Sequence, residues 1–214
     1  MEALIVVDIQ KDFCKGGALE VKNADDIIPV VNKLINKFQK QNKMIIATKD
    51  WHPETHKSFA VNSGGNVGEC GFLNGLPQIW WPIHCVQNGS GSEFHDNLLP
   101  IKNIIYKGTD ENIDSYSGFF DNGKLHKTKL DSVLKENKIE TLYILGLATD
   151  YCVKFTVLDA LDLGYKVYLI EDGCKGVNLN LNDSKNAIKE MISKGANIIL
   201  SSDIWNIYIS INLF

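Results

Sequence analysis

Six short apolar segments recur along the chain, and they constrain its fold more than any other feature. Each is rich in Ile, Val and Leu at consecutive positions and is bounded by polar or turn residues, which is typical of a strand buried on both faces. Such strands belong to a mainly parallel sheet that is covered by helices on two sides. The six predicted strands are residues 4–7, 44–47, 104–106, 142–145, 167–170 and 198–200.

Helical periodicity occupies several of the gaps between these segments. Apolar side chains three or four positions apart line one face of each predicted helix. Gly164 and Gly195 are stop signals for the third and fourth helices, and Asn182 or Asp183 could cap the start of the fourth. The repeating apolar positions are Ile27, Val30, Val31, Leu34, Ile35 and Phe38, then Leu130, Val133 and Leu134, then Phe155, Leu158 and Leu161, and finally Ala187, Ile188, Met191 and Ile192.

This alternation of strand and helix predicts the α/β class, with three α/β/α layers around a sheet of about six mainly parallel strands. The length of 214 residues and the hydrophobic content of 44% suit one domain over residues 1–214. Residues 51–99 interrupt the pattern with a long segment rich in Gly, Asn, Pro, Trp and His, and a long irregular insertion is usually functional. In such folds, ligands bind at the carboxyl ends of the strands.

Charge and cysteine content exclude several classes of function. The net charge is −4 and the basic residues are scattered, so we expect no nucleic-acid partner. All 22 basic residues are Lys, which removes the two-point fork that Arg offers to anions and favours a neutral small substrate. The five cysteines include no CxxC pair, no apolar run approaches the roughly 20 residues of a membrane span, and the start MEALIVVDIQ lacks a signal-peptide pattern. These features predict a cytoplasmic protein with no membrane partner.

Three reactive side chains follow three of the predicted strands. Asp8 follows LIVV, Lys107 follows IIY, and Cys152 lies a few residues after YILGL at the expected start of a helix. A helix N-terminus favours a thiolate over a thiol, so we expect an exposed Cys152 with a lowered pKa. Each residue alone is more often a packing thiol, a cap or a surface charge. Together at strand ends, a carboxylate, an ammonium and a thiol indicate an activated nucleophile.

A second group of residues offers metal ligands. Asp50 and His52 follow the strand MIIATK two positions apart, and His84 lies in the insertion. These three residues suit Zn²⁺, Fe²⁺ or Mn²⁺, with coordination positions left open for water or substrate. His56 is a further candidate, although it could equally orient another ligand or bond to the loop backbone. The histidines with polar neighbours, which we expect at the surface, are His95 and His126.

The chain also carries longer motifs, in the order KDWHPETHKSF, WWPIHCVQN, YKG, DSYSGFFDN and GLATDYCVKFTVLDAL. With these motifs, and with ALIVVDIQKDFCKGGALEV near its start, it resembles the nicotinamidase/pyrazinamidase family of the isochorismatase-like cysteine hydrolases. The resemblance spans nearly the whole chain and implies the isochorismatase-like hydrolase fold. It also implies metal-dependent hydrolysis of nicotinamide to nicotinate and ammonia through a Cys152 thioester, in NAD salvage, with a pyrazinamidase side activity.

The resemblance further implies roles for individual residues. It places a catalytic triad on Asp8, Lys107 and Cys152, an oxyanion hole on the backbone N–H groups of Ala148 and Cys152, and a cis peptide bond between Leu147 and Ala148. It implies one divalent metal ion, with Zn²⁺ favoured over Fe²⁺ or Mn²⁺. The other implied site residues are the metal ligands Asp50, His52 and His84, with His56 left open, and the substrate-binding residues Phe13, Trp81, Tyr116 and Leu147.

Two alternative functions and one unexplained segment remain. Another small-amide or carbamoyl-amine hydrolase of the same superfamily would share the triad, although the metal motif argues against it. A thiol redox or metal-binding regulator is motivated by the five cysteines and weakened by the lack of CxxC. Residues 205–214 are apolar and β-prone, and they could form an edge strand, a partner contact or an aggregation-prone end. A homo-oligomer also stays open.

Overall fold

The computed structural model describes residues 1–204, and its centre is a parallel sheet in the order β5-β2-β1-β6-β7-β8. All six predicted strands are confirmed, although β2 and β7 extend well beyond the predicted residues. Residue 200 lies outside β8, and the apolar segment 205–214 lies outside the described residues. The strands are β1 (Glu2–Val7), β2 (Met44–Asp50), β5 (Asn103–Lys107), β6 (Thr141–Leu147), β7 (Lys166–Lys175) and β8 (Asn197–Ile199).

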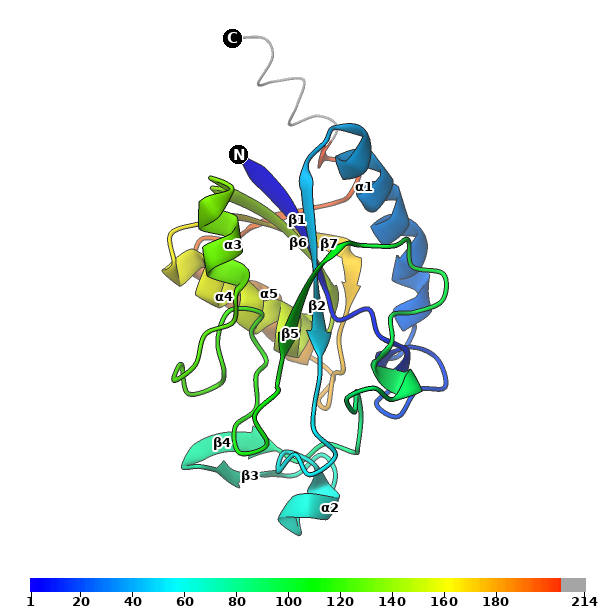
Figure 1. The fold of residues 1–214 in the computed structure, drawn as a ribbon, viewed down its shortest axis with the longest axis vertical. Helices are drawn as coiled ribbons and strands as arrows, with labels where there is room; N and C mark the ends of the chain where they lie inside the picture. Colours follow the sequence, from blue (N-terminus) through cyan, green and yellow to red (C-terminus); the bar gives the residue numbers. More distant parts are fainter. Residues whose placement is uncertain (205–214) are drawn as a thin grey trace.

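Helices cover both faces of this sheet, so the predicted three-layer architecture is confirmed (Figure 1). α1 (Ile28–Lys40) lies on one face, and α3 (Leu130–Glu136), α4 (Lys154–Asp162) and α5 (Asp183–Ser193) lie on the other. None of the helices within residues 1–204 combines the length and apolar character needed to cross a bilayer. The shorter turns are 3₁₀ helices at Lys11–Phe13, Ala24–Ile27 and Ser90–Ser92 and a π-helical turn at Thr149–Val153.

The start of α5 differs in detail from the prediction. Asn182 occupies the N-cap position, but its side chain makes no capping hydrogen bond. The carboxylate of Asp183 instead accepts the backbone N–H of Asn180 at 2.7 Å. The helix begins where the sequence predicts. The expected side-chain cap is wrong, because Asn182 makes no capping bond and the Asp183 carboxylate bonds to the preceding loop.

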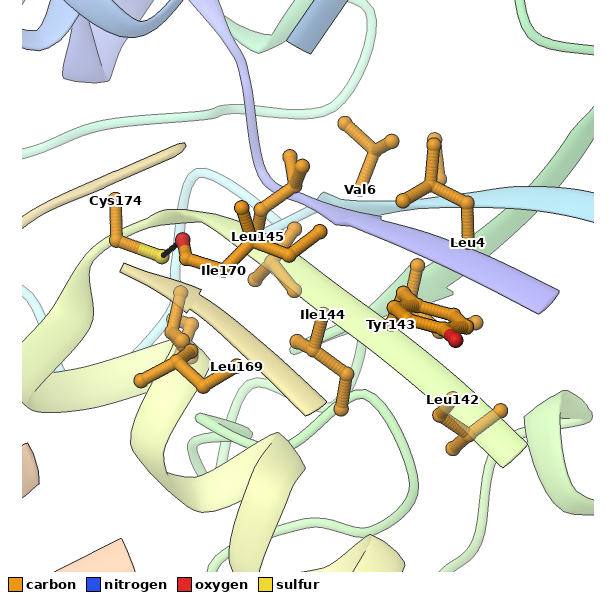
Figure 2. Close-up of a cluster of buried hydrophobic side chains, with 14 of the residues drawn as sticks. Leu4, Val6, Leu142, Tyr143, Ile144, Leu145, Leu169, Ile170 and Cys174 are labelled. Carbon is orange, nitrogen blue, oxygen red and sulfur yellow. Dashed lines mark hydrogen bonds between the residues drawn. The ribbon is translucent and has the colours of Figure 1, made fainter. Parts of the chain in front are cut away.

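The core lies between the central strands and the helices. Figure 2 shows side chains of β1, β6 and β7 packed together, among them Leu4, Tyr143 and Leu169. Burial of each large apolar side chain contributes about 1.5–3 kcal/mol before the entropy of ordering is counted. The thiol of Cys174 belongs to this cluster and donates to the carbonyl of Ile170 at 3.3 Å. The packed core therefore holds the strands, and the residues at their ends, in fixed positions.

The insertion at residues 51–99 is largely irregular, as expected, but it contains a β-hairpin that we did not predict. β3 (Cys70–Leu73) and β4 (Leu76–Ile79) pair in antiparallel fashion. Between them lie Asn74 and Gly75, with φ angles of 50° and 78°. An Asn-Gly pair is the strongest short-range signal for a hairpin turn, so the sequence did contain evidence for it. The hairpin and α2 (Ala60–Ser63) lie beyond the carboxyl ends of β2 and β5 (Figure 1).

The strand order brings the predicted reactive residues to one edge of the sheet. β5, β2, β1 and β6 are neighbours, and because they are parallel their carboxyl ends meet. Asp50 and Lys107 end β2 and β5 and are directly paired in the sheet register. Asp8 follows β1, and Ala148 follows β6. The predicted catalytic and metal-binding residues therefore meet at this edge of the sheet.

Candidate active site

The ammonium group of Lys107 is the centre of the site and is almost completely buried. Its Nζ lies 2.9 Å from Oδ2 of Asp8 and donates to the sulfur of Cys152 at 3.2 Å. It also donates to the carbonyl of Ser115 at 2.9 Å and forms a short ion pair with Oδ1 of Asp50. The three residues of the predicted triad are thus in contact, and Lys107 joins them to a predicted metal ligand.

Burial and charge determine the protonation of this cluster. Burial would lower the pKa of Lys107, but the carboxylates of Asp50 and Asp8 outweigh it and raise this pKa well above its usual value. Burial raises the pKa of Asp8, and Lys107 opposes the rise. Burial likewise raises the pKa of Cys152 well above that of a free thiol, although Lys107 again acts in the other direction. The cluster therefore holds a protonated lysine beside a thiol.

The expectation of an exposed Cys152 with a lowered pKa is wrong. The residue is 6% exposed, and the loss of solvation raises its pKa by more than the nearby Lys107 ammonium lowers it. A buried thiol of this kind must lose its proton to a neighbouring base before it can attack. Asp8 contacts the same ammonium as Cys152, and one of its carboxylate oxygens lies within 4.8 Å of the thiol sulfur.

The backbone around Cys152 is unusual. The residue lies in the π-helical turn Thr149–Val153, which leads directly into α4, so the predicted position at a helix start is confirmed. Single π-helical turns within helices are frequent at functional sites. The peptide bond between Leu147 and Ala148 is cis, as the resemblance implies. The two residues of the predicted oxyanion hole therefore lie on one short, irregular segment.

The predicted metal ligands form a compact and buried group. One donor atom from each of Asp50, His52 and His84 can be chosen so that all lie within 4.8 Å of one another. The Nε2 atoms of the two rings lie 3.6 Å and 3.9 Å from Oδ2 of Asp50. Their Nδ1 atoms each bond at 2.8 Å to a backbone carbonyl, of Gly108 and Pro82 respectively. A carbonyl only accepts, so both Nδ1 atoms carry protons, and the lone pair of each ring in its neutral form lies on Nε2, the atom that faces Asp50.

His56 lies beside this group, but its ring has the opposite arrangement. Its Nδ1 accepts the backbone N–H of Ser58 at 3.1 Å and contacts the Ser58 hydroxyl at 2.7 Å. Burial lowers the pKa of His56 to about 4, so the ring is neutral at pH 7. A neutral ring that accepts at Nδ1 carries its proton on Nε2, which leaves no lone pair there for a metal.

The two remaining histidines differ in their exposure. His126 is 71% exposed at its side chain, as expected. The expected surface position of His95 is wrong, because the chain after Ser90–Ser92 folds this ring to within 3.7 Å of Asp25 and half-buries it. Its Nδ1 accepts the N–H of Asn97 at 3.2 Å. The proton of this ring therefore lies on Nε2, as in His56, which leaves no lone pair there for a metal.

A cavity lies between the metal-ligand group and the thiol. The indole N–H of Trp81 donates to the hydroxyl of Tyr116 at 3.1 Å, and the ring of Phe13 lies 5.5 Å from that of His84. Leu147 is fully buried and does not line this cavity, although its cis peptide bond adjoins it at Ala148. The lining residues are Phe13, Leu19, Asp50, Trp81, His84, Asp114, Tyr116, Ala148, Tyr151, Cys152 and Val177.

Several residues of the site were not predicted. Asp114 is buried in the cavity wall and accepts a hydrogen bond from Gln78 at 2.8 Å. Gln10 bonds to the backbone of Asp50 through both ends of its amide, each at 2.8 Å, and so holds this ligand in place. Asp114 and Tyr151 lie inside the motifs DSYSGFFDN and GLATDYC, which was a usable signal. Gln10 lies inside the motif ALIVVDIQKDFCKGGALEV, but its role was not readable there because its partner, Asp50, is 40 residues along the chain.

Comparison with known proteins identifies the family to which this chain belongs. The family model of the isochorismatase domain matches residues 2–203. Over 203 residues the chain is 50% identical to a nicotinamidase of Escherichia coli K12, and the match covers 94% of this chain and 95% of that protein. The chain belongs to the nicotinamidase/pyrazinamidase group of the isochorismatase family. The protein is therefore a hydrolase of this family.

Solved structures of this family share the same architecture. A nicotinamidase pyrazinamidase of Acinetobacter baumanii superposes with a TM-score of 0.89 at 42% identity, covering 95% of this chain and 97% of that one. A pyrazinamidase of Pyrococcus horikoshii in complex with zinc superposes with a TM-score of 0.78 at 43% identity, covering 93% and 98%. The predicted isochorismatase-like fold is thus confirmed.

Proposed function

We propose that this protein is a nicotinamidase that hydrolyses nicotinamide to nicotinate and ammonia, and that pyrazinamide is a further substrate. One observation carries the proposal: the Cys152 thiol contacts the Lys107 ammonium at 3.2 Å, Asp8 contacts the same ammonium at 2.9 Å, and the thiol lines a cavity that also contains metal donors. Relatives at 43–50% identity are nicotinamidases, which supports this substrate.

The first half of the reaction transfers the acyl group to sulfur. Asp8 takes the proton of the Cys152 thiol, and the sulfur attacks the amide carbon of the substrate. The backbone N–H groups of Ala148 and Cys152 would stabilise the negative oxygen that forms. The C–N bond then breaks, the departing nitrogen takes the proton from Asp8, and ammonia leaves a thioester behind.

The second half releases the acid. Water attacks the thioester carbon while Asp8 accepts its proton, the C–S bond breaks, and Asp8 returns the proton to sulfur. Lys107 stabilises the negative charge on Asp8 and on the sulfur in both halves, since it contacts both atoms. At the end of the cycle, the Asp8 carboxylate and the Cys152 thiol are again in their starting protonation states.

The donor set fits one divalent metal ion, which we propose to be Zn²⁺, with Fe²⁺ or Mn²⁺ as alternatives. Asp50, His52 and His84 would hold it, because one carboxylate and two imidazoles with free Nε2 atoms are suitable ligands for these ions. When bound, the metal would supply a Lewis acid that orients the pyridine nitrogen, directly or through water. His56 stays outside the ligand set on account of its tautomer.

The aromatic walls of the cavity would select the ring. Phe13, Trp81 and Tyr116 line the space between the metal ligands and Cys152, and flat aromatic walls favour a flat heteroaromatic substrate. Leu147 is fully buried and lies outside the cavity lining, so we do not assign its side chain to ring binding. Binding of the ring and chemistry at the amide are thus assigned to different residues.

The decisive experiment measures ammonia release from nicotinamide by the zinc-loaded protein and by two cysteine variants. Cys152→Ala should lower kcat by about 1,000-fold or more, because the nucleophile is lost. Cys174→Ala is the matched control, since Cys174 is equally buried, at 7% against 6% exposure, but lies in the core away from the cavity. Activity retained by Cys152→Ala would overturn the mechanism. Absence of ammonia release by the unaltered protein would overturn the function.

A further inference from the structure

The hydroxyl of Thr48 makes two hydrogen bonds to Asp8, and it serves no other described residue. Thr48 lies in β2 and is fully buried. Its Oγ1 donates to Oδ1 of Asp8 at 2.6 Å and accepts the backbone N–H of Asp8 at 3.2 Å. Asp8 has a φ of 46°, a left-handed conformation that a residue with a side chain rarely adopts. One hydroxyl therefore bonds to both the side chain and the backbone of the residue that leaves β1.

These bonds fix which carboxylate oxygen faces the reaction. A carboxylate is planar, so holding Oδ1 at Thr48 also sets the direction of Oδ2. Oδ2 is the oxygen that contacts Lys107, at 2.9 Å, and Lys107 in turn contacts the sulfur of Cys152 at 3.2 Å. We propose that Thr48 is a positioning residue, whose hydroxyl holds the Asp8 carboxylate in the orientation that exchanges a proton with the thiol.

This inference rests on the proposed amidase function, and Thr48 would act through Asp8 alone. Thr48 does not line the cavity, so substrate does not contact it. Its methyl group has a separate task, since a Cβ placed on Gly118 would lie only 3.0 Å from Thr48 Cγ2. The methyl therefore packs closely against the backbone of Gly118, while the hydroxyl serves Asp8. The two halves of the side chain can be removed independently.

The test compares two substitutions that separate these tasks. Thr48→Val keeps the methyl packing and removes the hydroxyl, whereas Thr48→Ser keeps the hydroxyl and removes the methyl. We expect Thr48→Val to lower kcat for nicotinamide by about 10- to 100-fold, the effect of a misplaced catalytic group, with KM changed by less than about threefold. Thr48→Ser should retain kcat within about threefold even if its melting temperature falls. If Thr48 only supported packing through its methyl group, Thr48→Ser would lower kcat more than Thr48→Val.

Two results would overturn the proposal: a Thr48→Val protein with kcat close to that of the unaltered enzyme, or a Thr48→Ser protein that loses as much kcat as Thr48→Val. If Thr48→Val does not fold by circular dichroism, Thr48→Ala and Thr48→Ser make the same comparison, since they differ only in the hydroxyl. The unaltered enzyme is assayed in parallel. Ammonia release by it, with no difference between the variants, would remove the role of Thr48 and leave the proposed function in place.

Discussion

Gly108→Ala tests the support of the metal ligands, because this glycine adjoins the ring of His52. Gly108 has a φ of +65°, and its carbonyl accepts the Nδ1–H of His52 at 2.8 Å. A Cβ added there would lie 2.4 Å from Cε1 and 2.7 Å from Nδ1 of the ring. Since real contacts are never this short, the ring must shift and the hydrogen bond must weaken. His52 would then present its Nε2 in the wrong direction.

The expected effect has two parts, a loss of folding stability and a loss of metal affinity. The left-handed backbone of an alanine costs about 1–2 kcal/mol of unfolding free energy. Loss of the bond that orients a ligand histidine weakens metal affinity by about 10- to 100-fold, or about 1.4–2.8 kcal/mol of binding free energy. Competition for Zn²⁺ with a coloured chelator measures the affinity, and urea denaturation of the metal-free protein measures the stability.

Gly64→Ala is the matched control for backbone strain. Gly64 has a φ of +74°, and a Cβ there would meet no atom within 4 Å. We expect it to lose about 1–2 kcal/mol of stability through backbone strain, without the added clash of Gly108→Ala, and to bind Zn²⁺ as the unaltered protein does. If Gly108→Ala kept full zinc affinity, or if both variants lost affinity equally, then the proposed link between Gly108, His52 and the metal would be refuted.

Two further predictions concern buried ionisable groups. Lys107→Met should lower the free energy of unfolding at pH 7 by about 3–5 kcal/mol, because two buried carboxylates lose their counter-ion; an unchanged midpoint in urea would contradict this. Burial raises the pKa of Cys14 to about 12, so at pH 8 this thiol is protonated and unreactive. Iodoacetamide should therefore modify the exposed Cys70 far faster than Cys14, as followed by peptide mass spectrometry, and equal rates would contradict the assigned burial.

The sequence predicted most of the fold because its signals are local. Consecutive apolar residues such as those in β1 and β6 indicate strands buried on both faces, and the helical stripes depend on spacing within one segment. The order of the strands depends on pairing between segments far apart, which no local pattern encodes. The hairpin around Asn74 and Gly75 was missed because β4 contains Pro77 and lacks a clear alternation, although its turn was readable.

By itself, the sequence determined where the six strands of the main sheet and its covering helices lie, and it placed Asp8, Lys107 and Cys152 at or shortly after strand ends. Only the tertiary structure decided their chemical state. Burial makes Cys152 a protonated thiol rather than an exposed thiolate, and hydrogen bonds to the backbone distinguish the ligand rings of His52 and His84 from other histidines. The physical reason is that solvation and lone pairs depend on groups far along the chain, as with Thr48 and Asp8, which are 40 residues apart.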